Sequence, residues 1–407
     1  MTEQTNTPEL RFPEFKGEWE EKILSQLLEI KSGKVYKETE YTKEGIQLVQ
    51  GESIDHHKIK KIKTFLPDEY LNNTKNVVLE EGDIVLALNR PIIKDKLKIA
   101  KIPKQVAPSI LYQRAGKIIY DKSKPDFYLN LFDKHIKDFV MKESIGSDQP
   151  FIRTTQLKRK KIFVPGTEME ITKLNNFFSK LDRQIELEEE KLELLEQQKR
   201  GYMQKIFSQD LRFKDENGNE YPKWVTQKIK ELGNVYTGNT PSKKQSTYWN
   251  SNNYIWVTPT DINNKKDLKN SEYMLSDEGF KKARQLPKNT LLITCIASIG
   301  KNAILREEGS CNQQINALVP NSDKDVDFLY YAFEKVSKYM KRIAGKTATQ
   351  IVNKSTFENI SIEVPIFEEQ LKAGRFLNSF DKLIEKQVSK IELLKQRKQG
   401  FLQKMFV

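Results

Sequence analysis

Hydrophobic residues recur at heptad spacing in two stretches of the chain. In the first, residues in alternating steps of four and three read Leu174, Phe178, Leu181, Ile185, Glu188, Leu192, Leu195, Lys199, Tyr202 and Ile206. The second stretch repeats this pattern 199 residues later, as Ala373, Leu377, Phe380, Ile384, Gln387, Ile391, Leu394, Lys398, Phe401 and Met405. Polar residues interrupt both stretches at the same two registers. The spacing predicts two related amphipathic helices, each with a coiled-coil seam.

Each helix of about forty residues needs a partner for its apolar stripe, because helices in water owe most of their stability to packing. That partner could be the other helix or a helix of another molecule, and we favour the other helix of the same chain. An antiparallel pair would give the molecule an internal pseudo-two-fold. In that pair we expect Glu188 beside Lys398 and Gln387 beside Lys199, because buried polar positions commonly fix the register.

The remainder of each half has the pattern of strands mixed with short helices. We expect strands at 46–50, 83–88, 117–120, 254–258, 290–295 and 317–319, and helices at 127–142 and 326–343. The two starts also match, as Leu10-Arg11-Phe12 with Leu211-Arg212-Phe213, Trp19 with Trp224, and Gly33 with Gly238.

Each long helix is preceded by a strand that ends in Val-Pro, at Val164-Pro165 and Val364-Pro365, since proline ends a strand. A turn-rich linker at 214–220 separates the halves. We therefore predict an α+β fold with two tandem mixed α/β domains, residues 1–165 and 208–365. Each domain is followed by a long helix, residues 166–207 and 366–407.

Composition narrows the class of partner. The net charge is +13 and 31% of residues are charged, which suits a polyanion such as nucleic acid. The two cysteines, Cys295 and Cys311, form no C-x-x-C pair, and the longest apolar run, Leu291 to Ile299, is too short to span a bilayer. The first residues contain no apolar stretch typical of a signal peptide. We expect a soluble protein of the reducing cytoplasm, with no membrane partner.

Signatures of catalysis are mostly missing. The sequence has no G-x-G loop for a dinucleotide or S-adenosylmethionine, and no Asn-Pro-Pro-aromatic or Asp-Pro-Pro-aromatic run of an amino-methyltransferase. Gly345-Lys346-Thr347 resembles the end of a P-loop, but Met340 stands where the first glycine is required. Pro67-Asp68 and Pro125-Asp126 are better explained as turns than as parts of a nuclease site.

The histidines do not suggest a metal site. His56, His57 and His135 lack the spacing of zinc ligands, so we assign them surface or helix-cap roles. We expect no catalytic residue, no cofactor and no metal in this chain.

Polar and basic residues gather in segments of the second half that we expect to be loops. They are Thr237, Asn239, Thr240, Ser242, Lys243 and Lys244, then Ser298 and Lys301, then the amide run Asn312, Gln313 and Gln314. Lysine and hydroxyl groups bind phosphate, whereas asparagine and glutamine can hydrogen-bond adenine in the major groove. We expect these residues to contact DNA.

With the duplicated helices, these motifs make the chain resemble the specificity subunits of type I restriction-modification systems over essentially its whole length. The most specific parts are Gly238-Asn239-Thr240-Pro241-Ser242-Lys243, Tyr248-Trp249 and Trp256-Val257-Thr258-Pro259-Thr260-Asp261-Ile262. The last of these adds Thr258, Thr260 and Asp261 to the candidate DNA contacts. The helix ends Lys199-Arg200-Gly201-Tyr202 and Lys398-Gln399-Gly400-Phe401 also agree.

The resemblance implies two target-recognition domains that each read one part of a bipartite, asymmetric site in double-stranded DNA. Two helical regions would hold these domains apart as an antiparallel coiled coil and dock two methyltransferase subunits. The complex would methylate adenine and, with two restriction subunits, would cleave DNA using ATP. S-adenosylmethionine, ATP and Mg²⁺ would act in the partner subunits, and this chain would be non-catalytic.

The first half departs from the family pattern. Ser32-Gly33-Lys34-Val35 keeps the glycine but lacks Thr-Pro-Ser, and Tyr112-Gln113-Arg114 stands where the amide run is expected. An asymmetric target requires such divergence, because identical domains would read identical half-sites. The candidate DNA contacts of the first half are Lys31, Ser32, Lys34, Tyr36, Arg90, Gln113 and Arg114.

Two other classes of protein fit parts of the pattern. One is an autonomous nuclease or methyltransferase, which the missing motifs disfavour. The other is a coiled-coil scaffold with basic domains, whose DNA binding would depend on salt but not on sequence.

Overall fold

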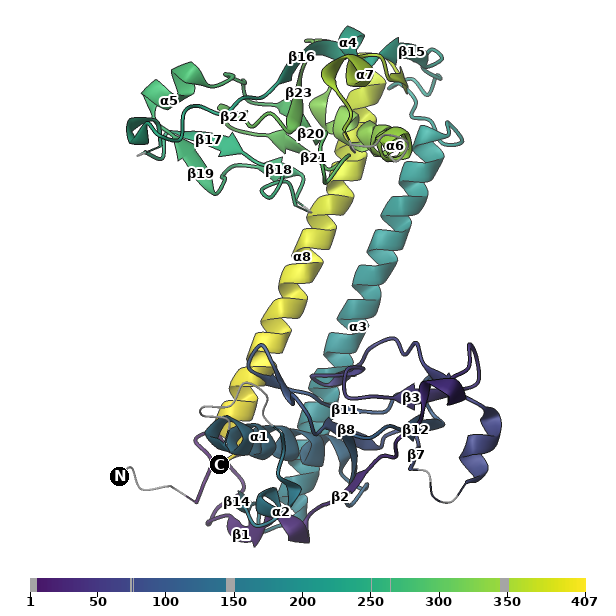
Figure 1. The fold of residues 1–407 in the computed structure, drawn as a ribbon, viewed down its shortest axis with the longest axis vertical. Coiled ribbons are helices and arrows are strands. Elements are labelled where there is room, and N and C mark those ends of the chain that lie inside the picture. The colour runs from purple at the N-terminus through teal and green to yellow at the C-terminus, as the bar shows by residue number, and fades with distance from the viewer. Residues whose placement is uncertain are drawn as a thin grey trace. The chain divides into compact units, whose positions relative to one another are not determined.

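The computed structural model describes residues 6–407, apart from residues 74, 76, 144–150, 250, 264 and 345–350. The P-loop-like Gly345-Lys346-Thr347 therefore lies outside the described residues. The chain divides into two compact units, Met1–Glu189 with Ser389–Val407 (unit 1), and Glu190–Val388 (unit 2). The long helices α3, Glu168–Phe207, and α8, Phe367–Met405, each contribute to both units (Figure 1).

The globular part of unit 1 is built on two four-stranded sheets. The first has the order β11-β8-β13-β2, made of Ile99–Lys101, Ile84–Ala87, Ala115–Ile119 and Glu29–Ser32. The second has the order β6-β3-β12-β7, made of Phe65–Leu66, Ile46–Val49, Ser109–Leu111 and Val78–Leu79. In the second sheet β12 runs parallel to β3, whereas its other neighbour, β7, is antiparallel.

Shorter elements complete unit 1. The two-stranded pairs are β1, Glu20–Ile23, with β14, Lys161–Val164; β4, Ile54–Asp55, with β5, Lys58–Ile59; and β9, Ile92–Ile93, with β10, Lys96–Leu97. The helices are α1, Pro125–Glu143, and α2, Thr154–Leu157, with 3-10 turns at η1, Leu24–Gln26, η2, Glu38–Glu40, and η3, Asp68–Asn72. Helix α1 buries Phe127, Leu131 and Phe132 in the same core as strands β8 and β13.

Unit 2 repeats this plan with a wider first sheet. Its order is β16-β23-β20-β21-β18, made of Gly233–Thr237, Ile315–Pro320, Thr290–Thr294, Asn302–Leu305 and Asp267–Leu268. The second sheet, β19-β17-β22, consists of Tyr273–Leu275, Tyr254–Val257 and Gly309–Cys311. Strand β22 runs parallel to β17, as β12 does to β3 in unit 1.

The remaining elements of unit 2 also have counterparts in unit 1. A strand pair joins β15, Val225–Lys228, to β24, Ser361–Val364. The helices are α4, Ile229–Leu232, α5, Asp277–Lys282, α6, Val326–Ala344, and α7, Lys354–Glu358, with a 3-10 turn at η4, Ser246–Tyr248.

The predicted fold class is confirmed. Every strand and both short helices that the sequence predicts are present within a few residues, and β14 and β24 end at Val164 and Val364, directly before the prolines. None of the helices in the described part of the chain is both long and apolar enough to cross a membrane.

Helices α3 and α8 pack against each other in antiparallel directions within each unit. In unit 1, Lys398 Nζ lies 2.6 Å from Asp182 Oδ1, and further along α3 Lys395 Nζ lies 2.7 Å from Glu189 Oε1. Rising numbers on α3 meet falling numbers on α8. In unit 2, Lys199 Nζ lies 2.5 Å from Asp381 Oδ1. Because the two ion pairs are related by the 199-residue repeat, the duplication extends to the seam contacts.

The expected partners of the polar seam residues were wrong. Lys398 pairs with Asp182, and Glu188 pairs instead with Lys390. Asp182 and Glu188 are six residues apart, which is about 9 Å along a helix. Likewise Lys199 pairs with Asp381, six residues before the expected Gln387. Helices α3 and α8 are therefore staggered so that Lys199 and Lys398 each pair with an aspartate outside the predicted seam.

A buried carboxylate ties the start of each domain to its long helix. In unit 1, Glu170 on α3 accepts hydrogen bonds from Arg11 Nε at 2.7 Å and Trp19 Nε1 at 3.3 Å. In unit 2, Glu369 on α8 accepts from Arg212 Nη2 at 2.6 Å and from Trp224 Nε1 at 3.2 Å. The weak sequence match between the two starts is thus a shared docking contact.

Candidate nucleic-acid interface

A glycine brings the first candidate loop against the end of a parallel strand in each unit. A Cβ atom added to Gly238 would lie 2.2 Å from the carbonyl oxygen of Cys311, and one added to Gly33 would lie 2.3 Å from that of Leu111. Any side chain at these positions would collide with backbone. Gly33 and Gly238 are therefore structurally equivalent, and so are the residues that follow β12 and β22.

In unit 2, backbone hydrogen bonds gather the predicted loops around the amide run. Asn239 N donates to Cys311 O at 3.0 Å, and Asn312 N donates to Val257 O at 2.9 Å, which brings the segment after β17 to the same place. Cys295 N donates to Gln314 O at 2.8 Å and adds the segment after β20. Four segments far apart in sequence thus form one loop surface.

Several polar candidates on this surface combine exposure with a fixed side chain. Thr240 Oγ1 donates to Gln313 Oε1 at 2.7 Å, which orients the amide of the exposed Gln313. The exposed Lys243 has its Nζ 5.5 Å from the ring centroid of Tyr273. Ser242, Lys244, Thr260 and Lys301 are also exposed. A glutamine held in this way can read a base edge, and lysines beside it can bind phosphate.

Other candidates in unit 2 have structural hydrogen bonds instead. Asp261 accepts from the backbone and hydroxyl of Thr258, both at 2.7 Å, and from Glu272 N at 2.9 Å, so its carboxylate closes a turn. Asn239 donates to Lys282 O at 2.9 Å and accepts from Arg284 N at 2.6 Å. These side chains shape the loops.

The last candidates of unit 2 are also held in place. Asn312 is buried and bonded to Gln314 in both directions, through Asn312 Nδ2 to Gln314 Oε1 and through Gln314 N to Asn312 Oδ1. Thr237 donates to Asn316 Oδ1 at 2.8 Å, and the carbonyl of Ser298 accepts from Thr294. These contacts support the exposed residues beside them.

Unit 1 forms the same backbone arrangement with different side chains. Gln113 N donates to Lys34 O at 2.9 Å, and Leu88 N donates to Arg114 O at 2.9 Å. Arg90, two residues after Leu88, is exposed and has a left-handed backbone with φ 47°, as does Ala297 of unit 2 with φ 61°. Lys34, Arg90 and Arg114 are therefore exposed on loops that meet around Gln113.

One first-half candidate lies in the core. Tyr36 is only 3% exposed and packs with Leu48, Leu66 and Ile110. Burial raises the pKa of its hydroxyl to about 12. Its ring cannot contact DNA on the surface, so we remove it from the candidates. Lys31 and Ser32 are exposed on the edge strand β2.

Sequence reasoning missed two lysines of unit 1. Lys98 Nζ donates to Gly51 O at 3.3 Å, and its pKa is lowered by burial and by the nearby charges of Lys60 and Arg90. Lys60 belongs to the run Lys58-Ile59-Lys60-Lys61-Ile62-Lys63, whose four lysines are exposed. That basic run was a signal available in the sequence. Both lysines extend the positive surface around Arg90.

The expected surface or helix-cap role was wrong for His135, which is buried, whereas His56 and His57 are half-buried. His135 is buried within α1, and the imidazoles of His56 and His57 stack with ring centroids 4.2 Å apart beside the buried Asp133. Burial lowers the pKa to about 4 for His56 and to about 3 for His57 and His135. All three are therefore neutral near pH 7.

His56, His57 and Asp133 bring ligand-type atoms within 4.8 Å of one another. However, Lys398 Nζ lies 3.0 Å from His57 Nδ1. A metal ion bound to His57 would be repelled by this ammonium. The stacked imidazole rings also direct their nitrogen lone pairs side by side, and not toward one shared metal ion. We therefore describe the group as a packed cluster, in which the hydrogen bonds of the two rings go to Leu97 O and to Lys398 Nζ.

The neutral histidines predict an acid-sensitive unit 1. An unfolded histidine has a pKa near 6.5, so unfolding takes up protons below that pH and stability falls as pH decreases. Between pH 6.5 and 5 each histidine should contribute a slope of up to about 1.4 kcal/mol per pH unit, and Asp133, whose pKa is raised by burial, should offset part of the sum. Hydrogen exchange resolved by unit would measure this loss.

Unit 2 contains no histidine, since all three lie in unit 1, and serves as the internal control. His135→Gln should reduce the number of protons that unit 1 takes up on unfolding by about one. Equal acid sensitivity of the two units over this range would contradict the assignment.

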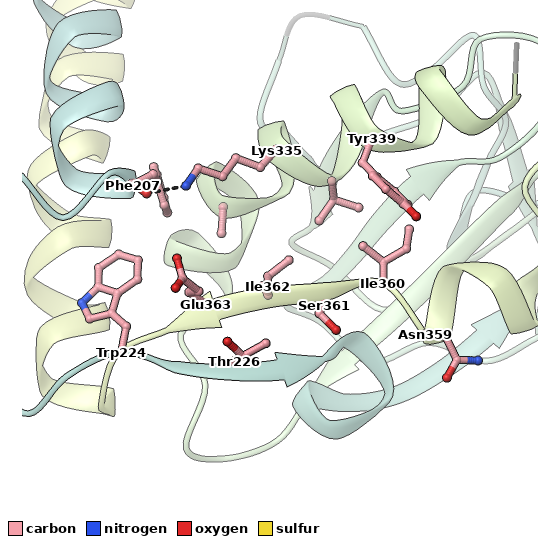
Figure 2. Close-up of a pocket in the computed structure, with 12 residues that line it drawn as sticks. Phe207, Trp224, Thr226, Lys335, Tyr339, Asn359, Ile360, Ser361, Ile362 and Glu363 are labelled. Carbon is pink, nitrogen blue, oxygen red and sulfur yellow. Dashed lines mark hydrogen bonds between the residues drawn. The ribbon is translucent and has the colours of Figure 1, made fainter.

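Unit 2 also holds a cavity of about 490 Å³ between α6 and the β15–β24 pair (Figure 2). Figure 2 shows Lys335 on α6 donating to the carbonyl of Phe207, at the end of α3. None of the candidate DNA contacts lines this cavity. It belongs to the packing of the helix end against the domain.

Comparison with known proteins identifies the repeated unit. Residues 16–197 and 221–395 each match the model of the type I restriction modification DNA specificity domain. The chain is 36% identical over 209 residues to the type I restriction enzyme MjaVIII specificity subunit of Methanocaldococcus jannaschii, covering 50% of this chain and 49% of the relative. The matched segment thus spans about half the length of that relative.

Two further similarities extend over nearly the whole chain. The putative type I restriction enzyme MjaX specificity subunit of the same organism is 24% identical over 97% of this chain and 95% of its own length. The crystal structure of a type I restriction-modification system S subunit from M. genitalium has the same fold, with a TM-score of 0.60 and 16% identity, over 98% of this chain and 99% of that one. The chain therefore belongs to the type I restriction modification DNA specificity family and carries the family's domain twice.

Proposed function

We propose that the chain is the DNA sequence-recognition subunit of a type I restriction-modification complex and binds a bipartite, asymmetric site in double-stranded DNA. The observation that carries this proposal is the pair of equivalent loop surfaces with unlike side chains. Unit 1 presents Lys34 and Arg114 where unit 2 presents Asn239 and Gln314, beside a glutamine that both surfaces share, Gln113 or Gln313. One backbone with two sets of side chains suits two different half-sites.

The chemistry of each surface supports this assignment. Arginine can bind guanine through two hydrogen bonds, and glutamine can do the same for adenine. Arg90 and Arg114 are exposed in unit 1, and Gln313 in unit 2. The surrounding lysines would bind phosphates and set the orientation without reading sequence. The net charge of +13 favours such a contact.

We further propose that two methyltransferase subunits dock on the long helices, and that two restriction subunits join in the full complex. Apolar residues outside the seam support a docking role. Leu194 is 54% exposed and Leu393, its counterpart in the repeat, is 56% exposed. Leu187, seven residues before Leu194, is 47% exposed and extends this face of α3, and exposed apolar patches mark protein interfaces. S-adenosylmethionine, ATP and Mg²⁺ would bind in those partners, and this chain would perform no catalysis.

Replacing Lys243 and Lys244 together with alanine tests the proposed surface. If both lysines neutralise phosphates, the slope of log K against log salt should fall by about 1.8, since each phosphate contact contributes about 0.9. Binding should be measured by fluorescence anisotropy with the chain in complex with its methyltransferase subunits. Lys382→Ala, on an exposed position of α8, is the matched control. An unchanged slope would remove the lysine pair from the DNA contact.

The two rival functions predict other results. Purified chain incubated with DNA, Mg²⁺ and S-adenosylmethionine would cleave or methylate if it were an autonomous enzyme. Selection from random duplexes would yield no motif if it were a sequence-independent scaffold. We expect no reaction from the chain alone and a two-part motif from the selection.

A further inference from the structure

The segment that follows the parallel strand β3 or β17 connects the loop surface to the long helices in each unit. We call residues 51–60, and residues 258–263 with 265–267, the connectors. The first begins at Gly51, where Lys98 donates to the backbone, and the second begins at the turn that Asp261 closes on Thr258. Each connector thus starts among the candidate DNA contacts.

The connector of unit 1 ends on the helix pair through His57. This residue has a left-handed backbone, with φ 55°, and its N–H donates to Ile99 O at 2.7 Å. Its ring then lies between two helices. Nδ1 is 3.0 Å from Lys398 Nζ on α8, and Nε2 is 3.2 Å from Asp133 Oδ2 on α1.

The connector of unit 2 also contacts the helices, through Lys266. This side chain is buried, and its ammonium donates to Asp327 Oδ1 on α6 at 2.7 Å and to Asn378 Oδ1 on α8 at 2.6 Å. Its Nζ also lies 5.4 Å from the ring centroid of Tyr331.

Each connector is linked to one seam lysine, directly in unit 1 and through Tyr331 and Asp381 in unit 2. His57 contacts Lys398, which pairs with Asp182, and Lys266 lies over Tyr331, which donates to Asp381, the partner of Lys199. The lysines that interrupt the heptad thus lie at a second contact between each domain and the long helices, besides that of Glu170 or Glu369. A buried charge is costly unless it is paired, and the two aspartates supply the opposite charge.

We infer that His57 and Lys266 are positioning residues for target reading, each fixing its connector on the helix pair and so orienting the loop surface of its own unit. This inference rests on the proposed function. A purely structural role for the two contacts would change stability alone, whereas a positioning role changes how well one half-site is discriminated.

The test uses the full chain in complex with its methyltransferase subunits. Binding is compared between the cognate duplex and duplexes with one base changed in either half. Gln313→Ala and Arg114→Ala, as single variants, first assign the halves to unit 2 and unit 1. His57→Ala should then reduce discrimination about tenfold in the half read by unit 1, and leave the other half within about twofold. Lys266→Met should do the reverse.

Conservative variants separate positioning from general damage. His57→Asn keeps an acceptor near the position of Nδ1 and tolerates a left-handed backbone, so it should restore discrimination. Lys266→Arg keeps charged donors and should do the same. If His57→Ala or Lys266→Met is unfolded at the assay temperature, Asn378→Ala is tested in its place. This variant removes one acceptor of Lys266, and we expect it to reduce discrimination in the half read by unit 2.

Equal loss in both halves, or loss of stability with full discrimination, would overturn the inference. Absence of any sequence preference in the unsubstituted complex would instead refute the proposed function.

Discussion

Replacing Gly238 by alanine is expected to abolish recognition of one half-site. The added Cβ would lie 2.2 Å from Cys311 O and 2.3 Å from Asn312 O, both backbone atoms of the strand end that carries the amide run. The loop must therefore move away, which separates Thr240 from Gln313. We expect binding to approach the non-specific level, about 10³-fold weaker or more. Unit 2 should also lose about 3 kcal/mol of stability, as overpacked sites do.

The matched variants make this prediction specific. Gly33→Ala should have the same effect on the other half-site, because its Cβ would lie 2.3 Å from Leu111 O. Gly201→Ala lies in α3 with no atom within 4 Å and should stabilise by about 1 kcal/mol, as alanine does in a helix. Anisotropy titrations against the two half-sites and thermal melting measure both effects. Normal binding by Gly238→Ala would show that the loop is not part of the contact.

Replacing Phe406 by alanine is expected to destabilise unit 1 by about 3–5 kcal/mol, the usual cost of truncating a buried phenylalanine. Its ring is 2% exposed and packs with those of Phe127 and Phe178, at centroid distances of 5.8 and 5.6 Å. Although 406 stands far from residues 6–165 in sequence, it completes their core. Deleting residues 401–407 should therefore open the core of unit 1.

Hydrogen exchange would locate the effect. Phe207→Ala provides the counterpart, because Phe207 packs on Phe328 in unit 2 as Phe406 packs on Phe127 in unit 1. Each substitution should raise exchange in its own unit. If Phe406→Ala left exchange in unit 1 unchanged, the end of α8 would not belong to that core.

Much of the fold could be predicted because it follows from local periodicity. The heptad, the strand runs and the Val-Pro boundaries all reflect which face of an element is buried, and burial of one face leaves a pattern in the residues. The equivalence of Gly33 and Gly238 could also be predicted, because the starts of the two halves match in sequence. Both positions require glycine, since a side chain there would collide with backbone.

Individual side chains were harder to place, because exposure depends on residues distant in sequence. Tyr36 entered the core because three hydrophobic residues from other strands surround it. Asp261 and Asn239 are polar residues on loops, yet their hydrogen-bonding groups hold backbone. Sequence shows that a residue is polar, but not whether its partner is a neighbouring backbone atom or DNA.

The seam illustrates the same limit. Because lysine interrupts the heptad at the same register in both helices, a specific partner was expected for each lysine. The expected partners were other seam residues. The partners of Lys398 are instead an aspartate just outside the stripe and a histidine from the globular part. A heptad pattern fixes which face is buried but leaves the stagger of two helices open, because several staggers pair apolar with apolar residues.

The central claim is that two divergent copies of one domain read two halves of a single DNA target. Mapping methylated adenines across the host genome, with and without this chain, tests it most directly. We predict a two-part motif that disappears when the chain is deleted. In cells carrying Gln313→Ala, bases should change in one part of the motif only. Unchanged methylation after deletion, or a change in both parts from that single substitution, would contradict the account.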